Sequence, residues 1–571
     1  MTLSSDPILE KEASKHIQSP RERVLALYAT LKSAVFSGSV DATILSQTDE
    51  LTELVDRGLL LTEGVTCALH YRALALACYI YYHFDRREQA RFYARTAPDG
   101  LAEMSKNIKT WVNTQPALIK AISLFALEYA HTELSRPFKY KDAINAIQAC
   151  QSAIERIVSE AAKCHATLGL SFYYLGHAWR GLNDYGQAER AFQESLRNYR
   201  RHAIIFKNWS DSKGDIDPVD FADYRSAVCQ ARGLGWLNLS RGRVSDASYN
   251  LHHARLSLVK RNDPINEAYV GLIDGEILRS SGRFPEAKIA FLEARANFDQ
   301  NGHRFGRSRC DYGLAKVHFE TDDYSKALEL ANGIQSSEDS RWRGRVGVLL
   351  SRIHRQLNNL ELSLKLAGES GALAQSVSDV RGELDARIAM AETEMLLGRF
   401  GSARGHLNYV LAKQNDLAEN DSPTGTPRRA NAKTTASCEL ALAACCLHQR
   451  DLVGAKDHFA NWRELRGEVE HNFLHRRAAE ISAEIEKSEV NFVIGLGPDQ
   501  STWKNALNYA NHHENLKRWL LARALEVNNT TSDAAKSLGI SRDACHRWMQ
   551  SYRFSSRRSA SKDSTDQTNG I

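Results

Sequence analysis

Apolar residues in the middle of the chain recur at the spacing of an amphipathic helix. In residues 172–196, FYYLGHAWRGLNDYGQAERAFQESL, Leu175 and Trp179 stand four apart and so share one face of a helix. Asn183 and Asp184 then interrupt the apolar pattern with residues that favour turns. We therefore predict a first helix that ends at a tight turn.

A second helix follows, and small residues mark where it meets the first. Ala188 is predicted to be the contact point where the helices cross, and Phe192 fills the space beside it. Gly176, on the first helix, allows the second helix to approach closely. The segment therefore predicts a packed helical hairpin.

The hairpin pattern recurs along the chain, as turns followed by a small crossing residue. Several steps, such as those from Ala247 to Ala287 and from Ala287 to Ala327, are 40 residues long. The predicted crossing residues are Ala90, Ala143, Ala188, Ala247, Ala287, Ala327, Ser363, Ala403 and Ala455.

The pattern resembles the tetratricopeptide repeat, whose length is about 34 residues. The longer step implies longer helices or longer turns. The resemblance implies an all-α fold in which residues 20–490 form a tetratricopeptide-like α-solenoid of about nine hairpins, preceded by an N-terminal extension at residues 1–19.

Polar stretches interrupt the array. Residues 205–222 are predicted to be an insertion and residues 413–432, rich in Pro, Gly and Ser, a mobile loop. Residues 491–502 are predicted to end the array, and residues 555–571, poor in apolar side chains, to be a disordered tail.

Residues 530–549, TTSDAAKSLGISRDACHRWM, have the pattern of two short helices around a turn at Gly539. Ser541 is a good N-cap for the second helix, and Thr531 or Ser532 can cap the first. With Gly539 at the turn, six positions should be buried: Ala534, Ala535, Leu538, Ile540, Cys545 and Trp548.

An amphipathic segment beginning at residue 514 precedes this pair, which predicts a small three-helix domain over residues 503–554. The domain resembles the Fis-type helix-turn-helix, the C-terminal DNA-binding domain of many bacterial enhancer-binding activators. It departs from that family at Cys545, where Leu is usual, and at Trp548, where more basic residues are usual.

The resemblance implies that the helix after Ser541 lies in the major groove of double-stranded DNA. Arg542 or Arg547 could then bind a guanine edge. The residues implied to face DNA are Ser541, Arg542, Asp543, Ala544, His546, Arg547 and Gln550, with Lys536 and Arg553 on the phosphate backbone.

Charge is concentrated in the same region. The chain of 571 residues has a net charge of only +5. Residues 514–558 hold nine Lys and Arg against four Asp and Glu, which gives the same excess of +5. This distribution favours a nucleic-acid-binding terminus over a chain that is basic throughout.

Other chemistry finds little support in the sequence. There is no phosphate-binding loop, nucleophile elbow or kinase signature, so we expect neither an enzyme nor a cofactor. Cys445, Cys446 and His448 lack a second ligand pair, and no metal site is expected. No signal peptide or membrane span is recognisable, which favours a cytoplasmic protein.

Two functional hypotheses remain. The first is a transcriptional regulator in which the array docks a protein or peptide partner and the terminal domain, as part of a homodimer, reads double-stranded DNA. The alternative is a non-enzymatic protein-interaction scaffold in which the terminal domain serves dimerisation or docking.

Overall fold

The computed structural model describes residues 20–37, 42–56, 64–134, 140–157, 165–206, 218–258, 263–334, 340–419, 431–494, 514–528 and 530–552. Every regular element in these ranges is a helix, which confirms the all-α prediction. The described residues divide into two compact units. One takes those up to Ala441 together with Asn461–His475, and the other takes Leu442–Ala460 and those from Arg476 onward.

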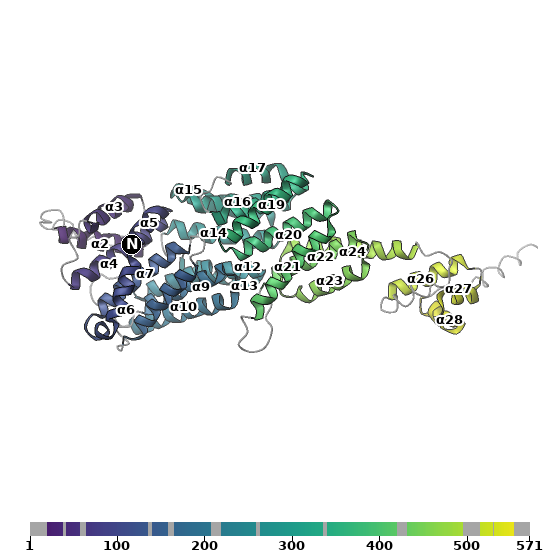
Figure 1. Cartoon of the computed structure of the whole chain (residues 1–571), viewed down its shortest axis with the longest axis horizontal. Helices are drawn as coiled ribbons and strands as arrows, with labels where there is room; N and C mark the ends of the chain where they lie inside the picture. Colours follow the sequence, from purple (N-terminus) through teal and green to yellow (C-terminus); the bar gives the residue numbers. More distant parts are fainter. Residues whose placement is uncertain are drawn as a thin grey trace, which may run out of the picture. The chain divides into compact units, whose positions relative to one another are not determined.

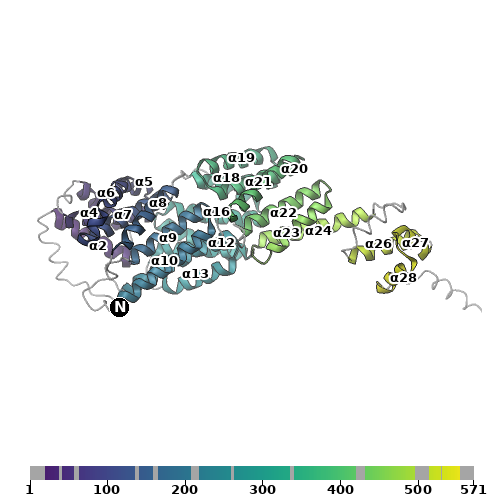
Figure 2. The ribbon, with the colours of Figure 1, turned by 60° about the horizontal axis from the view of Figure 1, so that its bottom comes forward.

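The helices of the first unit run side by side as a tetratricopeptide-like array (Figures 1 and 2). Up to the middle of the array they are α2 (Pro20–Ser37), α3 (Ala42–Asp56), α4 (Gly64–His83), α5 (Arg87–Ala94), α6 (Ala97–Thr114), α7 (Pro116–Glu133), α8 (Tyr140–Glu155), α9 (His165–Gly181), α10 (Tyr185–Phe206), α11 (Pro218–Val228), the π-helix η1 (Cys229–Gly235), α12 (Trp236–Arg241) and α13 (Val244–Leu258).

The array continues with α14 (Pro264–Ser280), α15 (Phe284–Gln300), α16 (Arg304–Glu320), α17 (Tyr324–Ile334), α18 (Ser340–Gln356), α19 (Leu360–Ser376), α20 (Val380–Leu396) and α21 (Phe400–Glu419). The helices α22 (Ala432–His448), α23 (Leu452–Leu465) and α24 (Asn472–Ile494) contribute residues to both units. The second unit also holds α26 (Glu514–Val527), α27 (Thr531–Leu538) and α28 (Arg542–Ser551).

Longer helices account for the 40-residue step. Each of α14, α15, α16, α18, α19 and α20 has 17 residues. A three-residue turn follows α14, α15, α18 and α19, so one helix with its turn takes 20 residues and one hairpin takes 40.

A common turn ends the helices. After α14, Gly282 has a φ of +80°, the amide of Gly282 donates to the carbonyl of Arg279 (3.0 Å) and the amide of Arg283 donates to that of Leu278 (2.9 Å). This left-handed cap satisfies two carbonyls that the helix end would leave without partners. Positive φ values recur at the same place in the turns at Asp85, Asn183, Gly242, Gly302, Asp322, Asn358, Ser378, Gly398 and Arg450.

The crossing residues lie where the pattern placed them. All nine are fully buried, with no solvent-accessible surface: Ala90, Ala143, Ala188, Ala247, Ala287, Ala327, Ser363, Ala403 and Ala455. Gly176 also has its predicted role, because a Cβ there would lie 2.6 Å from the ring of Phe192. A side chain at residue 176 would therefore push α10 away from α9.

Three predicted interruptions are shorter than expected. In the stretch 413–432, α21 continues to Glu419 and α22 begins at Ala432. In the insertion 205–222, α10 runs to Phe206 and α11 begins at Pro218, while α24 extends to Ile494 into the predicted boundary. Local polarity alone misplaced these ends, because a helix that has already formed can extend through polar residues by adding one backbone hydrogen bond per residue. The stretches 1–19 and 555–571 lie outside the described residues.

A helix that spans a bilayer needs about 20 predominantly apolar residues. Within the described ranges, no helix combines the length and apolar character needed to cross a membrane.

Candidate functional site

The helices α26, α27 and α28 pack around a small apolar core. Its fully buried members include Leu520, Leu538 and Cys545, and Ala524, Ala534 and Ala535 are small enough for the helix axes to come close. Leu525, Ile540, Trp548 and Tyr552 pack against this core and stay partly exposed. The three helices therefore hold one another in place.

Four of the six predicted core positions are buried, namely Ala534, Ala535, Leu538 and Cys545. The prediction was wrong for Ile540 and Trp548, which are partly exposed, and Met549 is buried in place of Trp548 with 3% of its surface accessible. Residues four apart on a helix stay closer to one face than residues three apart, so Met549 follows Cys545 into the core. Trp548 lies at the rim, where its ring centroid is 5.9 Å from Nζ of Lys517.

The turn between α27 and α28 has the predicted backbone. Gly539 is left-handed with a φ of +68°, and the amide of Ile540 donates to the carbonyl of Ala535 (3.0 Å). Oγ of Ser541 accepts the amide of Ala544 (3.1 Å), so Ser541 is the N-cap of α28.

The cap of α27 differs from the prediction. Thr530, rather than Thr531 or Ser532, is the N-cap, and its Oγ1 accepts the amide of Asp533 (3.1 Å). Its hydroxyl also donates to the carboxylate of Asp533 (2.6 Å). Thr530, which stands three residues before the acidic Asp533, thus caps α27 one or two positions earlier than expected.

One face of α28 is polar and open to solvent. Ser541, Arg542, Asp543, Arg547, Gln550 and Lys536 of α27 are exposed, and Ala544 and His546 are partly exposed. Asp543, Arg547 and Gln550 follow one another at helical spacing on the side opposite Cys545 and Met549, and Arg542 and His546 flank that side. Arg553 lies outside the described residues. The predicted surface residues that are described therefore belong to one contiguous surface.

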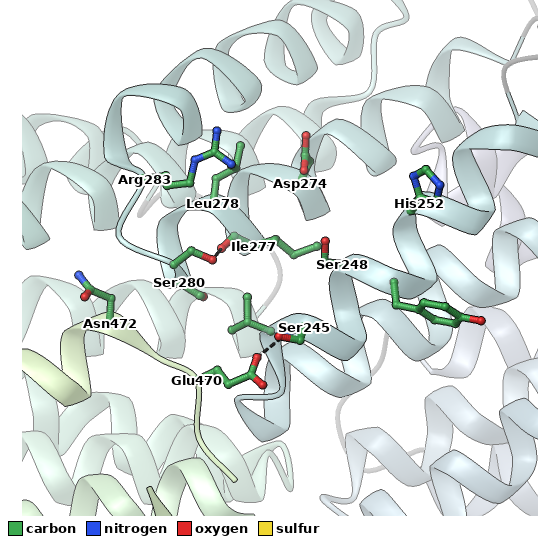
Figure 3. Close-up of a pocket in the computed structure, with 13 residues that line it drawn as sticks. Ser245, Ser248, His252, Asp274, Ile277, Leu278, Ser280, Arg283, Glu470 and Asn472 are labelled. Atoms are coloured by element: carbon green, nitrogen blue, oxygen red, sulfur yellow. Dashed lines mark hydrogen bonds between the residues drawn. The ribbon is translucent and has the colours of Figure 1, made fainter. Parts of the chain in front are cut away.

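A second candidate site lies in the array. A pocket of about 790 Å³ is bordered by α13, by the end of α14 and by the segment that carries Glu470 and Asn472 (Figure 3). Oε2 of Glu470 accepts the amide of Ser245 (2.6 Å) at the start of α13, and the amide of Glu470 donates to the carbonyl of Gly242 (2.8 Å). These two hydrogen bonds join segments 225 residues apart in sequence.

The pocket contains residue types used in hydrolysis, but they are not arranged for it. Ser248, His252 and Asp274 all line it, yet in the described structure no hydrogen bond joins them. Asp274 instead accepts from Nη2 of Arg255 (2.6 Å), and in Figure 3 His252 stands apart from Asp274. The pocket therefore has no nucleophile activated by a neighbouring base.

An unpredicted π-helix lies in the middle of the array. The segment η1 replaces one α-helical stretch between α11 and α12 and carries Arg232. Nη1 of Arg232 donates to Oδ1 of Asn266 (3.0 Å), and its guanidinium lies 3.9 Å from the ring centroid of Tyr269. Helical periodicity could not reveal this segment, because π and α turns differ by less than one residue; π-helical turns are often found at functional sites.

Cysteines and potential metal ligands are the remaining candidates for chemistry. Eight cysteine side chains are described, and each is a free buried thiol: Cys78, Cys150, Cys229, Cys310, Cys438, Cys445, Cys446 and Cys545. Among the described side chains, no group of three or more His, Cys, Asp or Glu is arranged to hold a metal ion.

No protein-family model and no curated protein sequence matches this chain. Solved structures with a similar arrangement of helices include the apo form of RapI, with a TM-score of 0.42 and 13% identity over 70% of this chain and 99% of that chain. The human IFIT1 dimer with m7Gppp-AAAA has a TM-score of 0.41 and 13% identity over 85% of this chain and 89% of that one. A Pyrococcus horikoshii signal transduction ATPase with a tetratricopeptide repeat sensor has a TM-score of 0.33 and 15% identity over 64% and 52%.

Proposed function

We propose that this protein is a non-enzymatic, DNA-binding transcriptional regulator. In this proposal the array, residues 20–490, docks a protein or peptide partner, and the terminal domain, residues 503–554, reads double-stranded DNA as part of a homodimer. The observation that carries the proposal is the exposed face of α28 described above, which follows the left-handed turn at Gly539.

The chemistry of that face suits a DNA groove. Arg542 and Arg547 are exposed on α28 and can each donate two parallel hydrogen bonds to a guanine edge. Ser541 caps the N-terminus of α28, where the helix dipole favours an anion such as a phosphate. Lys536 is exposed on α27 and adds positive charge beside the turn.

The array suits a docking role for a different reason. Stacked hairpins present an extended surface on which one polypeptide can contact several repeats at once. The pocket at α13 and α14 and the exposed Tyr249 at its edge offer one such place. A partner bound there would link an input in the array to an output at the terminal domain.

The test starts from the full chain and a pool of random-sequence duplexes. Rounds of enrichment on immobilised protein should select a preferred site, and mobility shifts on that site should weaken as salt rises. Arg542→Ala and Arg547→Ala should each weaken binding to the selected site by about tenfold or more, because each removes a base-edge or phosphate contact.

Arg404→Ala is the matched control, because Arg404 is an exposed arginine on α21 in the array. It should leave DNA binding unchanged. If no sequence is enriched and the α28 variants bind random duplexes as the wild type does, the DNA-reading role is wrong. The terminal helices would then serve dimerisation or docking in an interaction scaffold.

A further inference from the structure

Four arginines on the first helices of different hairpins influence one another electrostatically, and two of them, Arg232 and Arg309, lie 3.9 and 5.8 Å from the centroid of the same ring, that of Tyr269. They are Arg180 of α9, Arg232 of η1, Arg309 of α16 and Arg345 of α18, and we name them the arginine cluster. Burial lowers the pKa of Arg180 to about 10, and the charges of Arg309 and Arg345 act in the same direction. Burial also lowers the pKa of Arg309, where Arg232 and Arg345 are the neighbouring cations. The four like charges therefore act on one another.

Aromatic rings hold two of these side chains in position. The guanidinium of Arg232 lies 3.9 Å from the ring centroid of Tyr269, and that of Arg309 lies 4.4 Å from the ring centroid of Trp236. Stacking of this kind stabilises a cation through one face and leaves its N–H groups directed outward around the edge. Both groups are thus fixed with donors available.

The protein supplies too few carboxylates to pair with every member of the arginine cluster. Arg345 donates to both carboxylate oxygens of Asp379 (3.2 and 3.3 Å). Arg180 contacts the neutral ring of His177 (3.2 Å), whose pKa burial and Arg180 hold well below its ordinary value. Over the described part of the chain, Arg180, Arg232 and Arg309 form no ion pair with a carboxylate.

Asp263, the carboxylate that shares Asn266 with Arg232, already has several hydrogen-bond donors. Asp263 accepts from the hydroxyl of Tyr224 (2.5 Å), from the side chain of Asn266 (2.7 Å) and from its backbone amide (2.9 Å). Asn266 thus stands between Asp263 and Arg232, and it presents a neutral oxygen to the guanidinium. Partly buried cations without a counter-charge lower the stability of the fold unless a ligand supplies that counter-charge.

The cluster can be reached from solvent. All four side chains keep part of their surface accessible, and for Arg345 the exposed fraction is 36% although it is paired with Asp379. Trp236 is partly exposed beside Arg309. A ligand that combines negative groups with some apolar surface would therefore find both at the same place.

We propose that the arginine cluster binds the carboxylates of an acidic peptide docked on the array. The inference rests on the proposed docking role of the array and names the chemistry of its partner. Planar carboxylates match the fork of a guanidinium through paired hydrogen bonds. A nucleotide fits less well, because Arg232 and Arg309 cover a face of Tyr269 and of Trp236 on which a base would stack.

The test compares hexaglutamate, hexaglutamine and pyrophosphate as probes of the full chain by isothermal titration calorimetry. Hexaglutamate should bind and should raise the unfolding temperature, whereas hexaglutamine should do neither. The double variant Arg180→Gln/Arg309→Gln should weaken hexaglutamate binding by about tenfold or more, since it removes two of three unpaired cations. Arg304→Gln, an exposed position on α16, is the matched control and should bind as the wild type does.

A second measurement on the wild-type chain tests the proposal even if the double variant fails to fold. Arginines of the wild-type chain are labelled with phenylglyoxal, and the labelled positions are located by mass spectrometry. Hexaglutamate should protect Arg180 and Arg309 but not Arg304. Binding of pyrophosphate without hexaglutamate, binding by neither probe, or equal labelling with and without hexaglutamate would each overturn the proposal.

The outcome is independent of the DNA-reading role, since the variants and probes address the array alone. Loss of DNA binding in the α28 variants with intact hexaglutamate binding would overturn only that role. Failure of hexaglutamate with DNA binding intact would overturn only the acidic-peptide assignment.

Discussion

Two neighbouring parts of the array share one 20-residue period but pack side chains of different size between their helices. In α14–α16, Phe291 of α15 lies between two glycines, and a Cβ would come within 2.6 Å of its ring at Gly275 and 2.5 Å at Gly313. In α18–α20 the corresponding residue of α19 is Ala367, which packs in a cluster of small side chains that includes Ala389 of α20. One large ring between two glycines fills the space in the first region, and a group of smaller side chains, Val348, Ala367, Ala386 and Ala389, fills it in the second.

The buried polar groups of the two regions also differ. In α14–α16 a charged network is buried, in which Arg279 binds Glu276 and Glu320, and Lys316 binds Glu276. In α18–α20 Arg355 binds the buried Glu392, and buried hydroxyls form a further network, in which Oγ of Ser363 contacts Oγ of Ser351 (3.1 Å) and Oγ1 of Thr393 (2.9 Å). The backbone turns therefore set the period, whereas the choice of volumes and charges varies freely within it.

Removal of the large ring should have the largest effect. Phe291→Ala should lower the free energy of unfolding by about 4 kcal/mol, because a fully buried ring leaves a cavity that two glycines cannot fill. Urea denaturation of the full chain followed by circular dichroism measures the loss. Adding Gly275→Ala and Gly313→Ala to Phe291→Ala should recover part of it. A triple variant no more stable than Phe291→Ala would contradict size compensation as the difference between the regions.

The charged network should be the next most sensitive feature. Glu276→Gln should cost about 3 kcal/mol at neutral pH, because it leaves the buried Arg279 and the partly buried Lys316 without their shared carboxylate. Glu293→Gln, at an exposed position on α15, is the control and should change little.

The same network predicts a pH dependence. Burial by itself would raise the pKa of Glu276, but the charges and hydrogen bonds of Lys316 and Arg279 outweigh it and hold that pKa below 4.5. Its stabilising contribution is therefore present above the unfolded pKa and is lost as the pH falls through the folded one. The urea concentration at the unfolding midpoint of the wild type should decrease as the pH falls below about 4.5. That of Glu276→Gln should decrease less steeply over the same pH range. If the urea midpoints of the wild type and of Glu276→Gln decreased equally steeply with falling pH, Glu276 would not be the titrating group.

A pair of glycine substitutions should give the smallest effects, with opposite signs. Gly275→Ala should destabilise by about 2 kcal/mol, because its Cβ meets the ring of Phe291. Gly368→Ala in α19 should stabilise by about 1 kcal/mol, because no atom lies within 4 Å of its Cβ and alanine favours the helix. Thermal unfolding of both variants checks the prediction, and equal signs would mean that close packing does not explain Gly275.

Local rules predicted most of the terminal site. The left-handed Gly539, the Ser541 cap and the exposed face of α28 follow from residues within one turn of each other, so spacing alone was enough. Trp548 was misplaced because the choice between residues 548 and 549 depends on where α26 packs against α28. The DNA-reading role of that face stays a prediction from resemblance.

The sequence by itself determined the helical repeat, the positions of the crossing residues and the three-helix end, because these depend on side-chain size and helical periodicity over short separations. Only the tertiary structure decided which distant side chains share a site. The contact of Glu470 with Ser245 and the convergence of Arg180, Arg232, Arg309 and Arg345 depend on how successive hairpins stack. Small rotations between neighbouring repeats add up along an array, and no local pattern records their sum.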